Sequence, residues 1–150
     1  MDKLHIEQIR HELTWRLRRE VLYPAEPIVA MKMDEDAHGV HFGGFYDDQL
    51  VSVVSLFDKG TDFQFRKFAV LPTMQGKGVG KALLVYITNF AIAAGGERIW
   101  CNARSTAVEF YRKAGFTTTG QTFSKHGYDY EIFEKSLGSG VPAATGISSS

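Results

Sequence analysis

The sequence is short of cysteine, of net charge and of long apolar runs, and each shortage excludes a class of protein. Cys101 is the single cysteine among the 150 residues, so an intramolecular disulfide is excluded and a reducing compartment is expected. The 17 basic and 17 acidic residues balance, which argues against a nucleic-acid footprint or a polybasic membrane patch. No apolar run is long enough to span a bilayer, and the first residues lack the core of a signal peptide. We therefore expect a cytoplasmic protein with no nucleic-acid or membrane partner.

The length of the chain predicts one domain followed by a tail. A chain of 150 residues is large enough to bury a hydrophobic core. Residues 138–150 are small, polar and rich in glycine and serine, a composition typical of disorder. We expect a single domain over residues 1–137 and a disordered tail over residues 138–150.

A strand, a glycine-rich loop and a long helix organise the middle of the chain. Apolar residues recur over residues 65–71, and Pro72 closes this run, so a strand is predicted there. Apolar side chains then recur at helical spacing up to Ala94, which predicts a helix that begins near Gly78. The intervening glycines therefore lie at a helix N-terminus. Free backbone N–H groups and the helix dipole favour an anion there, and glycine lets a pyrophosphate approach the backbone.

The spacing of the loop excludes two kinds of phosphate-binding motif. A Walker loop has four residues between its first glycine and Gly-Lys, then Ser or Thr. Here three residues separate Gly76 from Gly80, and no Ser or Thr follows Lys81. A dinucleotide fingerprint would require a third glycine at the position of Lys81. The pattern that remains is Gln-x-x-Gly-x-Gly, and a glycine-rich helix cap without a ligand is the alternative.

The N-terminal third is predicted to begin with a helix. Apolar residues recur at helical spacing over residues 3–22, and charged residues occupy the other positions. Arg16, Arg18 and Arg19 are interpreted as part of a solvated helix face. The acidic residues 34–36 are interpreted as a polar turn.

Alternating patterns predict strands beyond the first third. Residues 41–46 and 50–57 flank a tight turn and are typical of an antiparallel hairpin. Residues 62–71 are predicted to form a third strand. A short apolar strand over residues 98–102 follows the long helix, which is the order of a parallel βαβ crossover.

The C-terminal part is predicted to contain one short helix and two strands. Gly95 and Gly96 end the long helix. Thr106 and Glu109 match a capping box, from which a short helix continues to Gly115. Residues 116–123 and 128–137 alternate as two antiparallel strands.

Neither metal binding nor a cysteine nucleophile is predicted. His38 and His41 are three residues apart, so on a strand they point to opposite faces, and no third ligand stands nearby. Cys101 has no basic partner evident in the sequence and is interpreted as a small buried strand residue.

A second motif supplies a family resemblance. Residues 102–116 read N-A-R-S-T-A-V-E-F-Y-R-K-A-G-F. A Phe-Tyr pair in a helix is by itself typical of a core. The pattern N-A-R-x-x-A-x-x-F-Y-x-K-x-G-F, however, resembles the closing helix motif of the GNAT superfamily of N-acetyltransferases. Gln75, Gly78 and Gly80 resemble the coenzyme A loop of the same superfamily, and the resemblance covers roughly residues 40–137.

The resemblance implies a fold and a reaction. The fold would be α+β in three layers, with a mixed, mostly antiparallel sheet whose central parallel strands splay to form a coenzyme A cleft. The reaction would be direct acetyl transfer from acetyl-CoA to a primary amine of a small molecule or protein, without a metal or a covalent intermediate, by a monomer or homodimer. The alternatives are a non-catalytic acyl-CoA-binding or regulatory domain and, less compatible with the loop, nucleotide hydrolysis.

The resemblance also implies roles for individual residues. Tyr111 would protonate the departing thiolate, and Asn102 would reach the pantetheine amide. The backbone of the strand before the loop would contact the pantetheine arm, and the loop itself would bind the pyrophosphate. These strand and loop residues are Phe68, Ala69, Val70, Gln75, Gly76, Lys77, Gly78, Val79, Gly80 and Lys81.

The general base departs from the family pattern. Many members carry a glutamate two residues before the position of Phe68, where this chain has Arg66, and arginine cannot deprotonate an ammonium group. The remaining candidates, acting directly or through water, are His41, Glu109, Asp129 and Glu131.

The strands after Phe116 would shape the acceptor side, with His126, Tyr128 and Asp129 as contacts.

Overall fold

The computed structural model describes residues 3–138, which divide into two compact units. The first unit comprises the described residues up to Phe57 together with Phe65–Asn89. The second comprises Asp58–Gln64 and the described residues from Phe90 onward. Residues 139–150 of the predicted tail lie outside the described residues. The prediction of a single domain over residues 1–137 stays a prediction.

Seven strands form one mixed sheet in the order β1-β2-β3-β4-β5-β7-β6. The β4 and β5 strands pair in parallel, whereas β1–β2, β2–β3, β5–β7 and β6–β7 pair antiparallel. The sheet confirms the predicted α+β fold with its central parallel pair. The strands are β1 Leu4–Ile9, β2 Val40–Tyr46, β3 Gln49–Lys59, β4 Asp62–Val70, β5 Arg98–Arg104, β6 Thr117–Lys125 and β7 Tyr128–Ser136. The α-helices are α1 Trp15–Leu17, α2 Val79–Ala93 and α3 Val108–Lys113.

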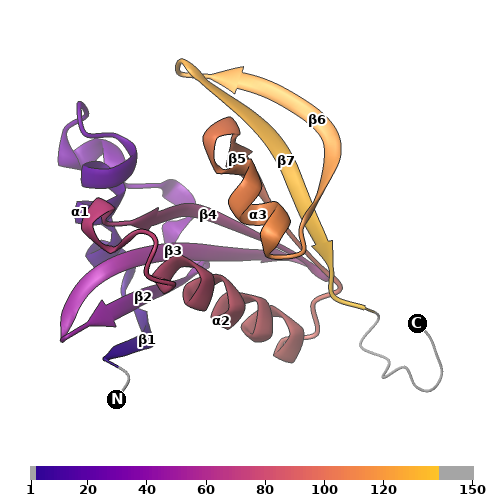
Figure 1. The fold of residues 1–150 in the computed structure, drawn as a ribbon, viewed down its shortest axis with the longest axis horizontal. Coiled ribbons are helices and arrows are strands. Elements are labelled where there is room, and N and C mark those ends of the chain that lie inside the picture. Colours follow the sequence, from indigo (N-terminus) through magenta and orange to yellow (C-terminus); the bar gives the residue numbers. More distant parts are fainter. Residues whose placement is uncertain (1–2, 139–150) are drawn as a thin grey trace. The chain divides into compact units, whose positions relative to one another are not determined.

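The chain begins with a strand, so the prediction of one helix over residues 3–22 is wrong. In Figure 1 the chain starts along the β1–β2 edge, and Leu4 pairs with Tyr46. A 3-10 turn (η1, His11–Thr14), the short α1 and a π-type turn (η2, Arg18–Leu22) follow. The apolar residues at the start of the chain fit a period of two as well as a helical period. Pairing with β2 decides between the two, because it satisfies the backbone groups of the segment.

The β2–β3 hairpin forms as predicted. Tyr46 pairs with Gln49, and the two residues between them, Asp47 and Asp48, have φ values of 51° and 65°. Two consecutive positive φ angles are the signature of a type I′ turn, whose twist matches that of the flanking strands.

The core of the first unit joins the N-terminal helical turn to the sheet. Leu17, Val53 and Ala69 are buried together. Partly buried aliphatic side chains surround them, and these are Ile9, Val21, Leu22, Leu50 and Leu71. Burial of this cluster fixes α1 against β3 and β4 within the first unit, since apolar contact area is the main stabilising contribution there.

The α2 helix confirms the predicted start near Gly78 and the predicted glycine stop. Gly95 has a φ of 86°, and the Gly96 N–H donates to the Ala91 carbonyl oxygen at 2.8 Å. A Cβ atom on Gly96 would lie 2.8 Å from that same oxygen. No helix of the described chain has both the length and the apolar character needed to cross a membrane.

The second unit contains the β6–β7 hairpin and α3, drawn in orange and yellow in Figure 1. His126 and Gly127, with φ values of 55° and 83°, make its tight turn. The predicted capping box is wrong: Ala107 occupies the N-cap of α3 without a side-chain hydrogen bond. Thr106 lies inside a preceding 3-10 turn (η6, Ser105–Ala107) and is therefore one residue too early.

Candidate active site

The glycine-rich loop is tied back to the end of β4. The Gln75 side-chain amide donates to the Val70 carbonyl oxygen at 3.0 Å. A short 3-10 turn (η5, Pro72–Met74) bridges the gap between these two residues. Gln75 thus brings the start of the loop close to the last residues of the strand, so that one region of the first unit contains both segments.

The loop needs glycine for its backbone conformation. Gly76 and Gly78 have φ values of 79° and 83°, a region that other residues rarely adopt. An added Cβ atom would meet nothing within 4 Å at either position, so space is not the constraint. The first intrahelical bond after the loop is Ala82 N–H to the Gly78 oxygen. The N–H groups of residues 79–81 therefore have no intrahelical acceptor and are available to an anion.

The end of β4 offers backbone rather than side-chain contacts. Ala69 is 1% exposed because its methyl group belongs to the core of the first unit. Phe68 is half-buried, and its ring lies 6.0 Å from that of Phe65. A ligand beside Ala69 could reach only the main-chain groups of that residue.

Tyr111 is buried within the aromatic cluster of the second unit. Its side chain in α3 is 7% exposed and contacts the rings of Phe110, Phe116 and Phe133 at centroid distances of 5.1, 5.9 and 6.5 Å. Burial raises the pKa of Tyr111 well above its usual value, and the nearby Cys101, whose sulfur accepts the hydroxyl hydrogen bond, raises it further. Tyr111 therefore keeps its proton at neutral pH and could act as an acid.

Cys101 is an inert thiol, as the sequence predicts. Burial raises the pKa of Cys101 to about 12, although the hydrogen bond from Tyr111 acts in the opposite direction. The thiolate needed for nucleophilic attack is therefore not populated near neutral pH.

Asn102 is exposed on β5 between two buried residues, Cys101 and Ala103. Successive side chains of a strand point to opposite faces. The Asn102 amide therefore lies on the face of β5 opposite to the thiol.

A family model confirms the identity that the loop and the tyrosine helix indicate. Residues 20–137 match the model described as "Acetyltransferase (GNAT) domain". The chain belongs to the GNAT family of acetyltransferases.

Several acetyltransferases resemble the chain along most of its length. The uncharacterized N-acetyltransferase YitI of Bacillus subtilis (strain 168) is 29% identical over 138 residues, which are 86% of this chain and 93% of YitI. A provisionally named N-acetyltransferase from Lactobacillus plantarum has a crystal structure with a TM-score of 0.80 at 17% identity, covering 91% of this chain and 99% of its own. A GNAT family acetyltransferase from Elizabethkingia anophelis, solved with acetyl-CoA bound, gives a TM-score of 0.73 at 15% identity and covers 91% and 100%. The last two likenesses concern the fold.

Arg66, which replaces the glutamate expected of a GNAT enzyme, forms an ion pair that sequence reasoning missed. Its guanidinium lies 2.6 Å from the Glu35 carboxylate. Glu35 accepts a hydrogen bond from its own backbone amide, and this bond and Arg66 together lower its pKa. No local spacing could have revealed the pair, because the two residues are 31 positions apart.

Three of the predicted base candidates are carboxylates with partners in the second unit. Glu109 pairs with Arg112 at 2.8 Å, and Asp129 accepts a hydrogen bond from Ser124 at 2.5 Å. Glu131 accepts a hydrogen bond from Thr118. Each carboxylate already has a partner, so proton transfer through any of them would require a rearrangement or a water molecule.

Arg18 is fully buried, so its prediction as part of a solvated face is wrong. Its guanidinium donates to both carboxylate oxygens of Asp36, each at 2.9 Å, and at 2.8 Å to Ser55 Oγ and the Met31 carbonyl oxygen. Burial alone would raise the pKa of Asp36, but the hydrogen bonds and charge of Arg18 outweigh it and lower that pKa. The pair fixes segment 31–36 against β3.

His41, the fourth base candidate, belongs to the same buried network. Its Nε2 lies 2.8 Å from the Asp36 carbonyl oxygen and its Nδ1 lies 2.7 Å from Ser55 Oγ. Burial lowers the pKa of His41, so the ring is neutral. A carbonyl oxygen only accepts, so the Nε2 atom carries the hydrogen, and Nδ1 accepts from Ser55. Both ring nitrogens are occupied.

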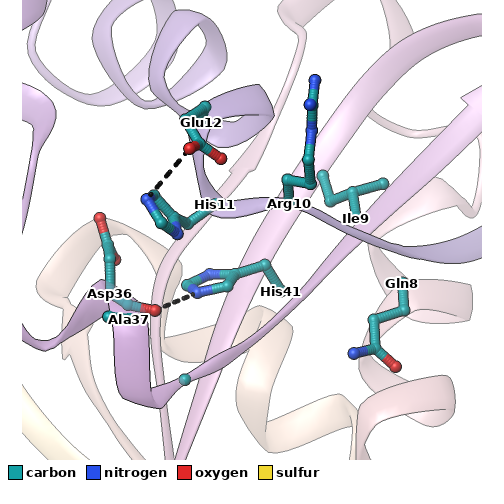
Figure 2. Close-up of a pocket in the computed structure, with 9 residues that line it drawn as sticks. Gln8, Ile9, Arg10, His11, Glu12, Asp36, Ala37 and His41 are labelled. Carbon is teal, nitrogen blue, oxygen red and sulfur yellow. Dashed lines mark hydrogen bonds and ion pairs between the residues drawn. The ribbon is translucent and has the colours of Figure 1, made fainter.

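A cavity of about 520 Å³ opens beside His41. Figure 2 shows the His11 ring between Glu12 and His41 at its wall. Two contacts join polar groups of the wall: His11 lies 3.5 Å from Glu12, and His41 Nε2 donates to the Asp36 carbonyl oxygen. None of the nine lining residues belongs to the predicted acetyl-CoA set. Within residues 3–138, no group of three or more His, Cys, Asp or Glu side chains is placed to hold a metal ion.

Proposed function

We propose that this protein transfers the acetyl group of acetyl-CoA directly to a primary amine of a small molecule or protein. The observation that carries the proposal is the loop at the start of α2, where Gly76 and Gly78 adopt left-handed conformations within a chain of the GNAT family. Such a loop presents backbone N–H groups to a pyrophosphate at the positive end of a helix.

The first unit would supply most of the cofactor contacts. The backbone N–H groups of residues 76–81 would bind the pyrophosphate, whereas the Gln75 N–H donates to the Pro72 carbonyl oxygen at 3.3 Å. The exposed Lys77 and Lys81 would add positive charge. The main chain of residues 68–70 would hydrogen-bond the pantetheine arm, which is compatible with the burial of the Ala69 side chain in the core. The exposed Asn102 is a further candidate contact for a pantetheine amide, as the family resemblance implies.

The chemistry requires a donor for the oxyanion, an acid for the thiolate and an acceptor for the proton of the amine. The neutral amine attacks the thioester carbonyl carbon, and the resulting oxyanion needs a donor, for which a backbone N–H of residues 68–70 is the candidate. When the carbon–sulfur bond breaks, Tyr111 would give its proton to the coenzyme A thiolate and recover it from solvent. Its hydroxyl would exchange its hydrogen bond to Cys101 for one to the thiolate.

The proton of the amine would leave through water. Glu109, Asp129 and Glu131 are bonded carboxylates that a water molecule could connect to the acceptor. His41 is the least suitable of the four bases, since both of its nitrogens are occupied. We further propose a cytoplasmic monomer or homodimer that needs no metal, nucleic acid or membrane.

An assay of thiol release on a panel of amines tests the proposal. The protein is incubated with acetyl-CoA and each small-molecule or peptide amine, and free coenzyme A is measured. Amine-dependent thiol release is the expected result. Binding of acetyl-CoA without release from any amine would favour a non-catalytic acyl-CoA-binding domain, and magnesium-dependent phosphate release from a nucleotide would contradict the proposal outright.

A further inference from the structure

One residue inside β4 has a backbone conformation that does not belong in a strand. Lys67 has a φ of 57°. The other non-glycine residues with positive φ in the described chain are Asp47, Asp48 and His126, which all lie in hairpin turns. Lys67 alone among them is within a strand, and a lysine there is unfavourable unless the surroundings hold it.

The side chains around Lys67 show that the strand contains one extra residue at this point. Phe65 and Phe68 are three positions apart, so a regular strand would place them on opposite faces. Their rings nevertheless lie 6.0 Å apart in an edge-to-face arrangement. The alternation of side chains is therefore interrupted between these two residues, which is the effect of a β-bulge.

Two neighbouring side chains at the bulge reach the same N-terminal segment, residues 23–38. Arg66 pairs with Glu35 at 2.6 Å. The Lys67 ammonium donates to the Tyr23 hydroxyl at 3.0 Å and lies 4.7 Å from the centroid of the same ring. In a regular strand these two neighbours would point to opposite faces. Lys67 therefore links the bulge to Tyr23, and Arg66 links it to Glu35.

Tyr23 is itself anchored. Its backbone N–H donates to the carbonyl oxygens of Arg18 and Arg19 at 3.2 and 3.1 Å, closing the π-type turn η2. Arg18 is in turn held by the buried pair with Asp36. The backbone that carries the Tyr23 ring is therefore fixed by hydrogen bonds.

We propose that Tyr23 is a positioning residue that holds Lys67 in its left-handed conformation and so fixes the backbone of residues 68–70. The inference rests on the proposed function, because that backbone is the part of β4 proposed to contact acetyl-CoA. Tyr23 acts through Lys67 and touches no reacting atom. A hydrogen bond and a cation–π contact from one side chain offset the unfavourable conformation.

Four variants separate this role from simple packing. Tyr23→Ala removes the support, Lys67→Ala removes the side chain but keeps the unfavourable φ, and Lys67→Gly removes both the side chain and the penalty. The fourth combines Tyr23→Ala with Lys67→Gly. Glu35→Gln is the matched control, since it weakens the neighbouring ion pair on the same segment without touching Lys67. The dissociation constant of acetyl-CoA is measured by calorimetry, and the melting temperature is measured without ligand.

We expect Lys67→Gly to suppress the effect of Tyr23→Ala on acetyl-CoA binding. Tyr23→Ala and Lys67→Ala weaken acetyl-CoA binding by about tenfold, the order of one strained residue. Lys67→Gly and Glu35→Gln stay near wild type, and Tyr23→Ala has no further effect once residue 67 is glycine. An equal loss from Tyr23→Ala in both backgrounds would overturn the inference, because Tyr23 would then act independently of Lys67.

The melting temperatures decide the question even without a cofactor. If the wild type binds no acetyl-CoA, the proposed function fails, and the inference then stands or falls on stability alone. Lys67→Gly should melt no lower than Lys67→Ala, since glycine adopts a positive φ freely. A clearly lower melting temperature for the glycine variant would overturn it.

Discussion

The two units bury ionisable groups in opposite ways. The first unit buries Arg18 and Asp36 as a charged pair with complementary hydrogen bonds. The second buries Tyr111 and Cys101 as a neutral pair that keeps both protons. Both solutions avoid an isolated buried charge, which is the costly state. The charged pair and the neutral pair differ in the direction of pH change that disrupts each of them.

The pKa shifts predict that each unit loses stability at a different end of the pH range. The lowered pKa of Asp36 stabilises the folded protein above the unfolded pKa of a carboxyl group, and this contribution is lost as pH falls through the folded pKa. The raised pKa values of Cys101 and Tyr111 favour the neutral forms, so folding loses stability as pH rises above the unfolded values. The charged network is thus sensitive to acid and the neutral pair to alkali.

The largest expected effect is that of breaking the charged pair. Arg18→Met leaves the Asp36 carboxylate buried without its cationic partner, with only the Met33 backbone N–H still donating to it at 3.1 Å, which should lower the free energy of unfolding by about 3–5 kcal/mol. Arg16→Met is the matched control, because Arg16 forms an exposed pair with Glu20 and should change stability by less than about 1 kcal/mol. Urea unfolding measures both. Equal effects would show that burial of the Arg18 pair is not important for stability.

Removing the phenol hydroxyl tests the neutral pair as part of the catalytic machinery. Tyr111→Phe should lower turnover by about 100-fold, the size of one general-acid contribution, while the acetyl-CoA dissociation constant stays the same. The aromatic contacts with Phe116 and Phe133 remain in this variant. Steady-state kinetics and calorimetry measure the two quantities. Wild-type turnover across the whole pH range would exclude Tyr111 as the acid.

The loss of stability at alkaline pH should depend on the buried Cys101 thiol. Because the pKa of Cys101 is raised to about 12 from a reference value of 9.0, the free energy of unfolding should fall above pH 9 by about 1.4 kcal/mol per pH unit from this group. Cys101→Ala should remove that part of the slope. The slopes, rather than the absolute stabilities, are compared, since the substitution also leaves a small cavity. Identical slopes would contradict a buried neutral thiol.

Part of the loss of stability at acid pH should depend on His41. Its pKa is lowered, so below about pH 6.5 the unfolded chain binds a proton that the folded chain does not. Stability should therefore fall by at most about 1.4 kcal/mol per pH unit in this range, and His41→Gln should flatten the curve. Asp36, Arg18 and His11 are the charged or titratable groups that act on this ring.

Local patterns in the sequence were sufficient for the elements that depend on neighbouring residues. The glycine loop, the start of α2 and the presence of a tight turn between β2 and β3 follow from backbone preferences that act over a few positions. Period alone could not separate a strand from a helix over residues 4–9, where pairing with β2 decides. The predicted capping box placed the start of α3 one residue too early, because a 3-10 turn, η6, precedes this helix.

The features that sequence analysis missed join residues far apart in the chain. Arg18 is separated from Asp36 by 18 positions and from Ser55 by 37, and Arg66 from Glu35 by 31. Each of these side chains is polar, and without the fold an exposed position is the better expectation for it. Burial of Arg18 follows only once β3 and segment 31–36 have come together around it.

The central claim is that the loop before α2 binds acetyl-CoA, and calorimetry on two glycine variants tests it most directly. Gly78 and Gly95 flank α2, have φ values of 83° and 86°, and would place a Cβ atom in open space. Gly78→Ala and Gly95→Ala therefore impose the same backbone strain at opposite ends of one helix. We predict that wild type and Gly95→Ala bind acetyl-CoA alike and that Gly78→Ala binds it more weakly. No binding by the wild type, or an equal loss in both variants, would contradict the claim.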